Sequence, residues 1–119
     1  MSLTSADDSI RLAPASQFTI EKLTALYNKT RVDYMVPMPM NVARLADYIH
    51  LYDIDLDHSF VAMQNEEMLG VAMLGVRHQR AWITRLGVAP ATRRHGAGQM
   101  LVKSLIAAAD SLHLPLIML

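Results

Sequence analysis

The stretch that decides the fold runs from Trp82 to Leu112 and reads WITRLGVAPATRRHGAGQMLVKSLIAAADSL. Its first part, through Val88, is mostly aromatic, β-branched or large and apolar, which predicts a strand. Pro90 ends this strand because a proline has no backbone N–H to donate. From Gln99 to Leu112 there is no glycine or proline, and apolar residues recur at helical spacing. The second part is therefore predicted to be a helix with one buried face.

Two arginines and two glycines lie between this strand and this helix, in the run Arg93-Arg94-His95-Gly96-Ala97-Gly98. The first amides of a helix have no intrahelical partner, and the helix dipole places roughly half a positive charge there. Glycines let an anion approach these amides, and arginines add forked donors. Neither GxGxxG nor a P-loop fits the spacing. The run is interpreted as an anion site, and the alternative is a tight turn with solvated arginines.

Length and composition favour a single folded domain over residues 1–119. Apolar residues make up 52% of the chain and charged residues 18%, which excludes a disordered chain. Eleven basic residues balance eleven acidic ones, so no nucleic-acid partner is expected. The chain has no cysteine, which excludes disulfides and thiol nucleophiles and favours a cytoplasmic location. No apolar run has the length of a membrane span, and the histidines lack metal-site spacing, so neither a membrane nor a metal is expected.

The other elements follow from local patterns. Strands are predicted at 9–13, 59–64, 68–78 and 114–119, with a hairpin turn at 65–67. Two helices are predicted before the hairpin, and Ser16 and Asn41 are their expected N-caps. The order β-α-α-β-β-β-α-β predicts an α/β (α+β) fold, a mixed sheet with helices packed on it. Because the sequence stops inside the apolar run 114–119, we expect a domain truncated in its fifth strand, whose isolated chain associates or is poorly stable.

The strand, its Leu86-Gly87-Val88-Ala89-Pro90 exit, the R-x-x-G-x-G loop and the following helix together resemble the acyl-CoA-binding core of the GNAT superfamily of N-acyltransferases. The resemblance implies a GNAT-like, mostly antiparallel mixed sheet flanked by helices, of which the chain holds the N-terminal two-thirds. It also implies acetyl-CoA as the acyl donor. The residues that it places on the cofactor are Leu86, Gly87, Val88, Arg93, Arg94, His95, Gly96, Ala97, Gly98 and Gln99.

The same resemblance implies that strands four and five separate around the pantetheine arm, where a bulge interrupts their pairing. Gly87 is interpreted as that bulge or as a close backbone approach, and otherwise as a weak point in the strand. A main-chain amide near Leu86 is expected to donate to the developing oxyanion. Thr84 is a candidate to order the water that takes the amine proton. Arg85 cannot act as the base because it is permanently charged.

Other acids and bases have weaker claims. Glu66, Glu67 and His78 are alternative general bases, set against the interpretation that they are a solvated turn and a strand end. In the family the acceptor pocket lies at the loop between the first two helices. Its candidate contacts here are Tyr34, Met35 and Met38, whose alternative role is to fill the core.

The implied function is direct transfer of an acetyl group from acetyl-CoA to a small-molecule or peptide amine, in a monomer or a homodimer. One rival is a non-catalytic acyl-CoA-binding or sensing domain, favoured by the missing carboxylate on strand four. A second rival is an interaction or nucleic-acid-binding module that uses residues 92–94. A turnover assay with a panel of amines separates the enzyme from the sensor.

Overall fold

The structure, a computed structural model, describes residues 9–32, 39–92 and 96–117. The helices and strands follow the predicted order, and they are β1 (Ile10–Pro14), α1 (Ile20–Lys29), α2 (Val42–Leu51), β2 (Phe60–Gln64), β3 (Glu67–Arg77), β4 (Arg80–Val88), α3 (Ala97–Ser111) and β5 (Leu116–Ile117). Short 3-10 turns lie at Ala15–Gln17, Leu56–His58 and Pro90–Thr92.

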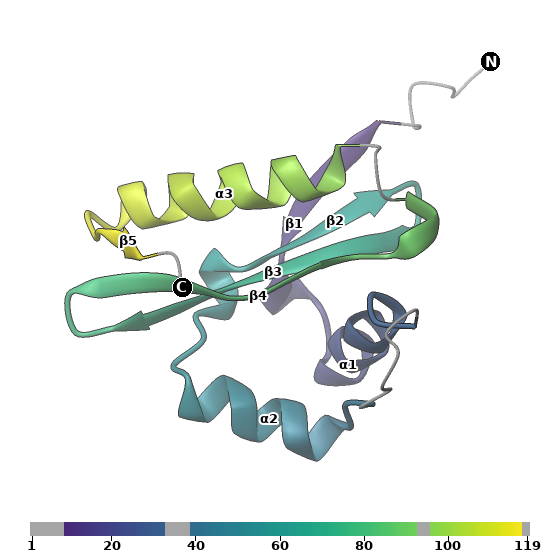
Figure 1. Ribbon diagram of the computed structural model, residues 1–119, viewed down its shortest axis with the longest axis horizontal. Coiled ribbons are helices and arrows are strands. Elements are labelled where there is room, and N and C mark those ends of the chain that lie inside the picture. Colours follow the sequence, from purple (N-terminus) through teal and green to yellow (C-terminus); the bar gives the residue numbers. More distant parts are fainter. Residues whose placement is uncertain (1–8, 33–38, 93–95, 118–119) are drawn as a thin grey trace.

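One five-stranded sheet in the order β1-β2-β3-β4-β5 forms the centre of the molecule. Neighbours from β1 to β4 are antiparallel, whereas β5 runs parallel to β4. Helix α3 covers one face, and α1 and α2 cover the other (Figure 1). This arrangement confirms the predicted mixed, mostly antiparallel sheet flanked by helices.

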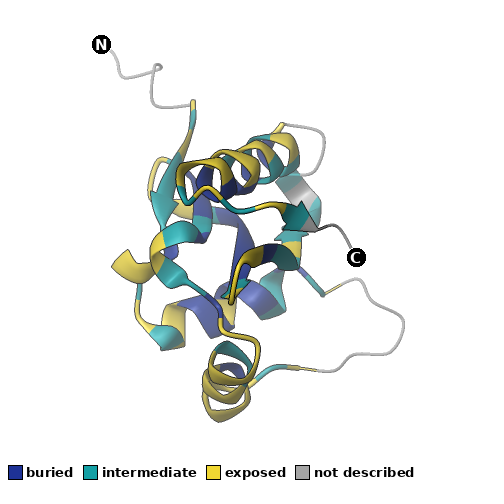
Figure 2. Cartoon of the chain, turned by 90° about the vertical axis from the view of Figure 1, so that its left-hand side faces the viewer, coloured by how far each residue is buried: buried dark blue, intermediate teal, exposed yellow. Residues whose placement is uncertain are grey.

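Each face of the sheet carries its own hydrophobic core. On the α3 face, Leu101 and Leu105 pack on Leu69 and Leu74 of β3. On the opposite face, Leu23 and Leu26 of α1 and Leu45 of α2 belong to a second cluster of buried residues. The sheet and the inward sides of the helices are buried, and the outer side of α3 is exposed (Figure 2).

The first helix begins later than the sequence predicted. Ser16 is not its N-cap, because it lies in the 3-10 turn Ala15–Gln17. Thr19 caps α1 instead, and its side chain accepts from the Lys22 N–H. The tertiary structure decides between the two hydroxyls, since the buried Ala15 donates its N–H to Ser59 O at 2.7 Å and so fixes the turn. The second cap is confirmed, because Asn41 Oδ1 accepts from the Arg44 N–H at 2.8 Å.

The third helix begins earlier than predicted, at Ala97 rather than Gln99. Gly96 is its N-cap and has a φ of 89°, in the left-handed region that a side chain disfavours. In the fifth strand the described part is only Leu116–Ile117, and the last two residues of the predicted run lie outside the described residues.

Candidate functional site

The N-terminal end of α3 is open in the described chain. Gly96 provides no side-chain cap, and a Cβ placed on it would meet no atom within 4 Å. Gly96 O accepts from the Met100 N–H at 3.1 Å, so the helix is already formed at its first turn. The N–H groups at the start of α3 therefore have the orientation that suits an anion.

Strand β4 ends in a short turn that hydrogen bonds hold in place. The Ala89 N–H donates to Leu69 O at 2.7 Å, which extends the pairing with β3 one residue past the strand. The N–H and the hydroxyl of Thr92 both donate to Ala89 O, each at 2.9 Å. These bonds fix the direction in which the chain leaves the sheet, although Arg93, Arg94 and His95 lie outside the described residues.

A bulge interrupts β4 at Thr84. Met73 is paired with Arg85 and Leu74 with Ile83, so Thr84 has no partner residue on β3. The packing of the side chains shows the same extra residue. In a regular strand, residues that are an odd number of positions apart face opposite sides of the sheet. Ile83 and Val88 are an odd number of positions apart, yet both contact the α3 core, as Ala81 does. One inserted residue exchanges the faces of every later side chain. Arg85 and Gly87 consequently face α1 and α2.

The position of the bulge decides between the two interpretations of Gly87. Gly87 is in regular register with Val71, so it is not the bulge. It is a close-approach position: an added Cβ would lie 2.7 Å from Thr30 Oγ1 and 2.9 Å from Thr30 Cβ. The missing side chain lets the C-terminal end of α1 lie directly against β4.

The second half of β4 is a sheet edge within the described chain. β5 pairs with Ala81 and Trp82 only, and the described residues of β5 supply no strand partner for residues 83 to 87. In an antiparallel strand successive residues turn their N–H groups to opposite sides. Ala89 donates toward β3, so Leu86, three residues earlier, directs its N–H to the free edge. The side chain of Leu86 is 41% exposed there.

Two tyrosines hold Arg85 beside this edge. Its Cζ lies 4.4 Å from the ring centroid of Tyr48 in α2 and 5.4 Å from that of Tyr27 in α1. The Tyr48 hydroxyl also donates to Thr84 O at 3.2 Å, so the same ring contacts the bulge and the arginine. The Arg85 Nε atom is buried and has no hydrogen-bond partner in the described chain. This cluster was not predicted from the sequence, where its one signal is an arginine between apolar residues of a strand.

The alternative general bases lie far from the bulge. Glu67 is at the β2–β3 hairpin, where it pairs with Lys29 Nζ at 3.2 Å. His78 is in the β3–β4 turn at the opposite end of β3. At about 3.3 Å per strand residue, Glu67 lies roughly 20 Å from Thr84 and His78 roughly 15 Å. The interpretation as a solvated turn and a strand end is the one that fits this geometry. Tyr34, Met35 and Met38 lie outside the described residues.

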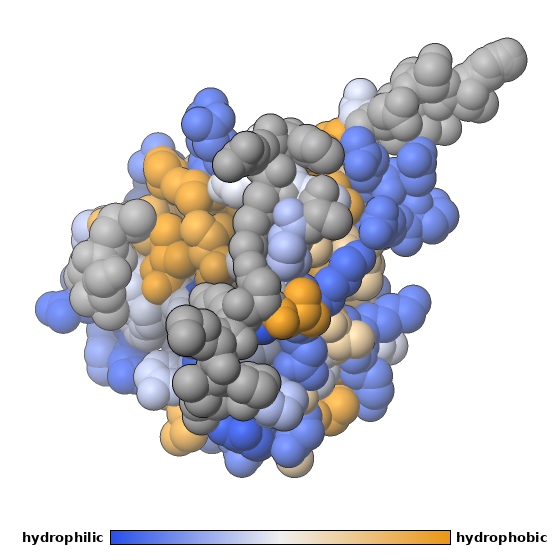
Figure 3. Space-filling view, turned by 45° about the vertical axis from the view of Figure 1, so that its right-hand side comes forward, coloured by the Kyte–Doolittle hydropathy of each residue, from blue (hydrophilic) through white to orange (hydrophobic). Residues whose placement is uncertain are grey.

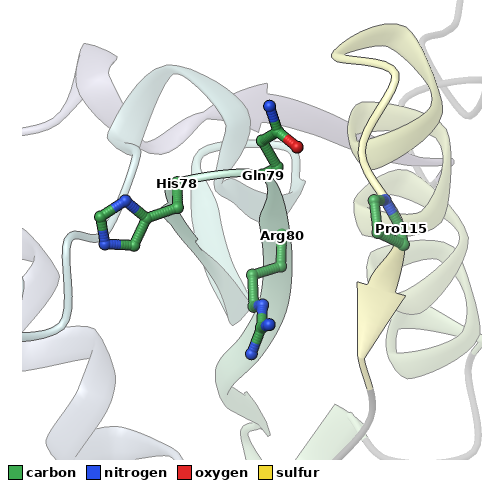
Figure 4. Close-up of a pocket in the computed structure, with 4 residues that line it drawn as sticks. All are labelled: His78, Gln79, Arg80 and Pro115. Carbon is green, nitrogen blue, oxygen red and sulfur yellow. The ribbon is translucent and has the colours of Figure 1, made fainter.

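A separate hollow lies at the start of β4, lined by His78, Gln79, Arg80 and Pro115 (Figure 4). Because α3 follows the other end of β4, this hollow is not part of the site. Within residues 9–32, 39–92 and 96–117 no three His, Asp or Glu side chains come together as metal ligands. Among the described helices, none has the length and apolarity that a membrane crossing requires.

The free edge of β4 and the glycine-led end of α3 fit the acyltransferase family that the sequence motif resembles. The chain belongs to the acetyltransferase (GNAT) family, which it matches over residues 23–119. No curated protein sequence matches it.

Solved structures of N-acetyltransferases share the fold. The ribosomal-protein-S18-alanine N-acetyltransferase from Escherichia coli is 19% identical with a TM-score of 0.68, over 89% of this chain and 63% of that one. The PaiA N-acetyltransferase from Thermoplasma acidophilum, solved in complex with coenzyme A, is 15% identical with a TM-score of 0.67, over 89% of this chain and 75% of that one. An aminoglycoside acetyltransferase from a soil metagenomic sample, solved with sisomicin, is 16% identical with a TM-score of 0.67, over 93% and 76%. The chain thus spans less than two thirds of the first of these proteins.

Proposed function

We propose that the chain is an acetyl-CoA-dependent N-acetyltransferase that passes the acetyl group directly to an amine. The observation that carries this proposal is the free edge of β4 after the Thr84 bulge, where the Leu86 N–H faces the gap beside a glycine-led helix end. Membership of the acetyltransferase (GNAT) family supports the same reaction. Coenzyme A complexes of two proteins with this fold, the PaiA enzyme and NatC, support the acyl donor.

In this proposal two elements of the chain bind different parts of the acyl donor. The open amides of α3 bind the pyrophosphate, together with Gly96 and Gly98, and Arg93 and Arg94 add positive charge. The backbone of Leu86, Gly87 and Val88 binds the pantetheine arm as an added strand would. Acetyl-CoA supplies an activated thioester whose carbonyl carbon reacts with the amine.

The transfer itself needs a donor to the carbonyl oxygen and a place for one proton. The C–N bond forms as the C–S bond breaks, and the proton lost by the amine balances the charge of the released thiolate. The Leu86 N–H is proposed to donate to the oxygen as it gains negative charge. Thr84 is proposed to order the water that takes the amine proton. With no cysteine in the chain, an acyl-enzyme on a thiol is excluded.

A non-catalytic acyl-CoA-binding domain is the second candidate. It is favoured by strand β4, which has no Asp or Glu from Arg80 to Val88. Calorimetry with CoA and a turnover assay with a panel of amines separate the two functions. The enzyme binds CoA and releases it in proportion to the acetylated amine formed. CoA binding with no amine-dependent release would establish the sensor, and no CoA binding would exclude both.

A further inference from the structure

Arg85 is a permanent cation in a position where the described chain supplies no negative partner. The ion pairs of the described residues are Lys29–Glu67 and Asp53–Arg77, with Asp55–His58 a third when the imidazole is protonated, and none includes Arg85. Its Nε–H is buried without an acceptor. A buried donor of a charged group that lacks a partner is costly, so such a group needs a ligand or a functional reason.

The rings that contact Arg85 hold its guanidinium in place without neutralising it. Tyr48 and Tyr27 lie 4.4 and 5.4 Å from its Cζ, and a second guanidinium, that of Arg31, lies 4.7 Å from the Tyr27 ring. Aromatic faces attract a cation but leave its hydrogen-bond donors available. A guanidinium fixed in this way can bind a carboxylate with little further loss of side-chain entropy.

The location of Arg85 relates it to the acceptor rather than to the acyl donor. It immediately precedes Leu86, whose N–H faces the free edge, and it lies on the α1 and α2 face of the sheet. Helix α3, with the proposed pyrophosphate site at its start, lies on the opposite face (Figure 1). If the acyl donor reaches the edge of β4 from the α3 side of the sheet, the amine approaches that edge from the opposite side, where Arg85 lies.

We propose that Arg85 selects the acceptor, and that the acceptor is an amine that also carries a carboxylate. The forked N–H groups of a guanidinium match the two oxygens of a carboxylate. The carboxylate would accept from the Arg85 guanidinium and so orient the amine toward the edge of β4. This inference rests on the proposed acetyl transfer and narrows its substrate class.

The kinetic test compares acceptors that differ only in the charge of one group. β-Alanine and β-alaninamide test a free amino acid, and amidated peptides that begin with Asp-Ala-Ala or Asn-Ala-Ala test a peptide N-terminus. We expect the acid of at least one pair to exceed its amide in kcat/KM by about tenfold to a hundredfold, as for a hydrogen bond to a charged group. In Arg85→Gln the ratio should fall to near one, with partial recovery in Arg85→Lys. Arg80→Gln, at the exposed start of β4, is the matched control and should keep the wild-type ratio.

A second measurement does not require turnover. The Arg85 Nε–H should give a side-chain ¹H–¹⁵N signal, assigned by its loss in Arg85→Gln, that shifts on titration with the acid and not with the amide. If Arg85 had only a structural role, Arg85→Gln would keep the acid-to-amide ratio of kcat/KM, and the Nε–H signal would not shift on titration with the acid. Turnover of acids and amides at equal rates, or an Nε–H signal that ignores carboxylates, overturns the inference while acetyl transfer stands. If no amine reacts, the titration alone decides whether Arg85 binds a carboxylate, and only the proposed transfer fails.

Discussion

Single residues determine which groups β4 presents to a ligand. If Thr84 were paired as an ordinary strand residue, Arg85 would face α3 and Leu86 would face the tyrosines. With the bulge, a charged side chain is turned away from the apolar α3 core, and Ile83 and Val88 both remain in that core. One inserted residue therefore places both the backbone edge and the cation of the proposed site.

The two glycines at the start of α3 have different structural roles, and alanine substitutions should separate them. Gly96→Ala should destabilise the fold by about 1–2 kcal/mol, because its φ of 89° is left-handed. Gly98→Ala should instead stabilise it by about 0.5–1 kcal/mol, since Gly98 lies within α3 and its added Cβ meets only Val88 Cγ2 at 3.7 Å. Denaturant titrations of both variants measure these changes.

CoA calorimetry on the same pair tests the anion site. If phosphate oxygens bind the first amides of α3, the methyl group of Gly98→Ala should weaken CoA about tenfold or more while stability rises. An unchanged affinity in that variant would remove the Gly98 backbone from the proposed pyrophosphate site.

Gly87 should be intolerant of substitution because of Thr30. The methyl of Gly87→Ala would lie 2.7 Å from Thr30 Oγ1, so we expect a loss of about 1–3 kcal/mol in unfolding free energy. Thr30→Ala removes the nearest atom but leaves its Cβ at 2.9 Å. The double variant should therefore recover part of the loss, with a coupling of at least about 0.5 kcal/mol. If the losses of the two single variants simply add in the double variant, α1 moves enough to remove the contact between residues 87 and 30.

At the scale of elements, β4 is an edge whose backbone is the proposed catalytic group. Leu86→Pro removes the N–H that faces the edge and leaves the pairing with β3 in place, because Leu86 donates away from β3. We expect a two- to three-order loss of kcat at saturating acetyl-CoA. Leu86→Ala keeps the N–H and is the control, with kcat within about threefold. A folded Leu86→Pro enzyme with normal kcat would exclude this amide as the oxyanion donor.

Helix α2 supports the bulge through one hydroxyl. Tyr48→Phe keeps the ring beside Arg85 and deletes the hydrogen bond to Thr84 O. A loss of about 0.5–1.5 kcal/mol in stability is expected from this single bond. Tyr52→Phe is the control, because Tyr52 is the C-cap of the same helix and is 48% exposed, and it should change stability by under about 0.5 kcal/mol. Equal effects in thermal unfolding would mean that the bond to the bulge contributes nothing.

The order of the elements could be predicted because it depends on local patterns. The apolar, β-branched run of β4, the stop at Pro90 and the helical spacing after Gly98 are all signals within a few residues. The choice between Ser16 and Thr19 as helix cap could not be predicted, because both are capping residues and a bond between Ala15 and Ser59 decides it.

The site was predictable only in part for the same reason. Glycines at a strand-to-helix junction indicate an anion site from sequence alone. The bulge is a property of two strands in register, and Thr84 looks like any strand residue. The contacts of Arg85 with Tyr27 and Tyr48 join residues far apart in the chain, and both tyrosines have the ordinary spacing of buried helix positions.

At the scale of the whole molecule, the surface that Figure 3 brings forward has hydrophobic patches among hydrophilic residues rather than one apolar face. Among the described residues, the exposed large hydrophobic ones are spread over several elements and are Val32, Val42, Leu51, Tyr52, Leu86 and Ile106. Within the part of the chain that the structure describes, these residues do not form one contiguous apolar patch of the kind that marks a large protein interface. Leu86 is the one among them that lies on the proposed site.

The proposed site joins two parts of the molecule that the sheet otherwise keeps separate, the start of α3 and the free edge of β4. A ligand that bridges both should protect both from hydrogen exchange, because opening either part would break its contacts. We expect acetyl-CoA at a hundred times its Kd to slow exchange at Leu86 and at the first amides of α3 together, by up to about a hundredfold, as for a stabilisation of about 2.7 kcal/mol. The β1–β2 pairing, from Ile10↔Gln64 to Pro14↔Phe60, lies at the other edge of the sheet and supplies the internal control for global stabilisation. Mass-spectrometric or NMR exchange measures all three regions in one experiment. Protection at α3 alone would mean that the pyrophosphate binds at the start of α3 while the pantetheine arm does not contact β4. Equal protection in all three regions would mean that the ligand slows exchange only by raising global stability.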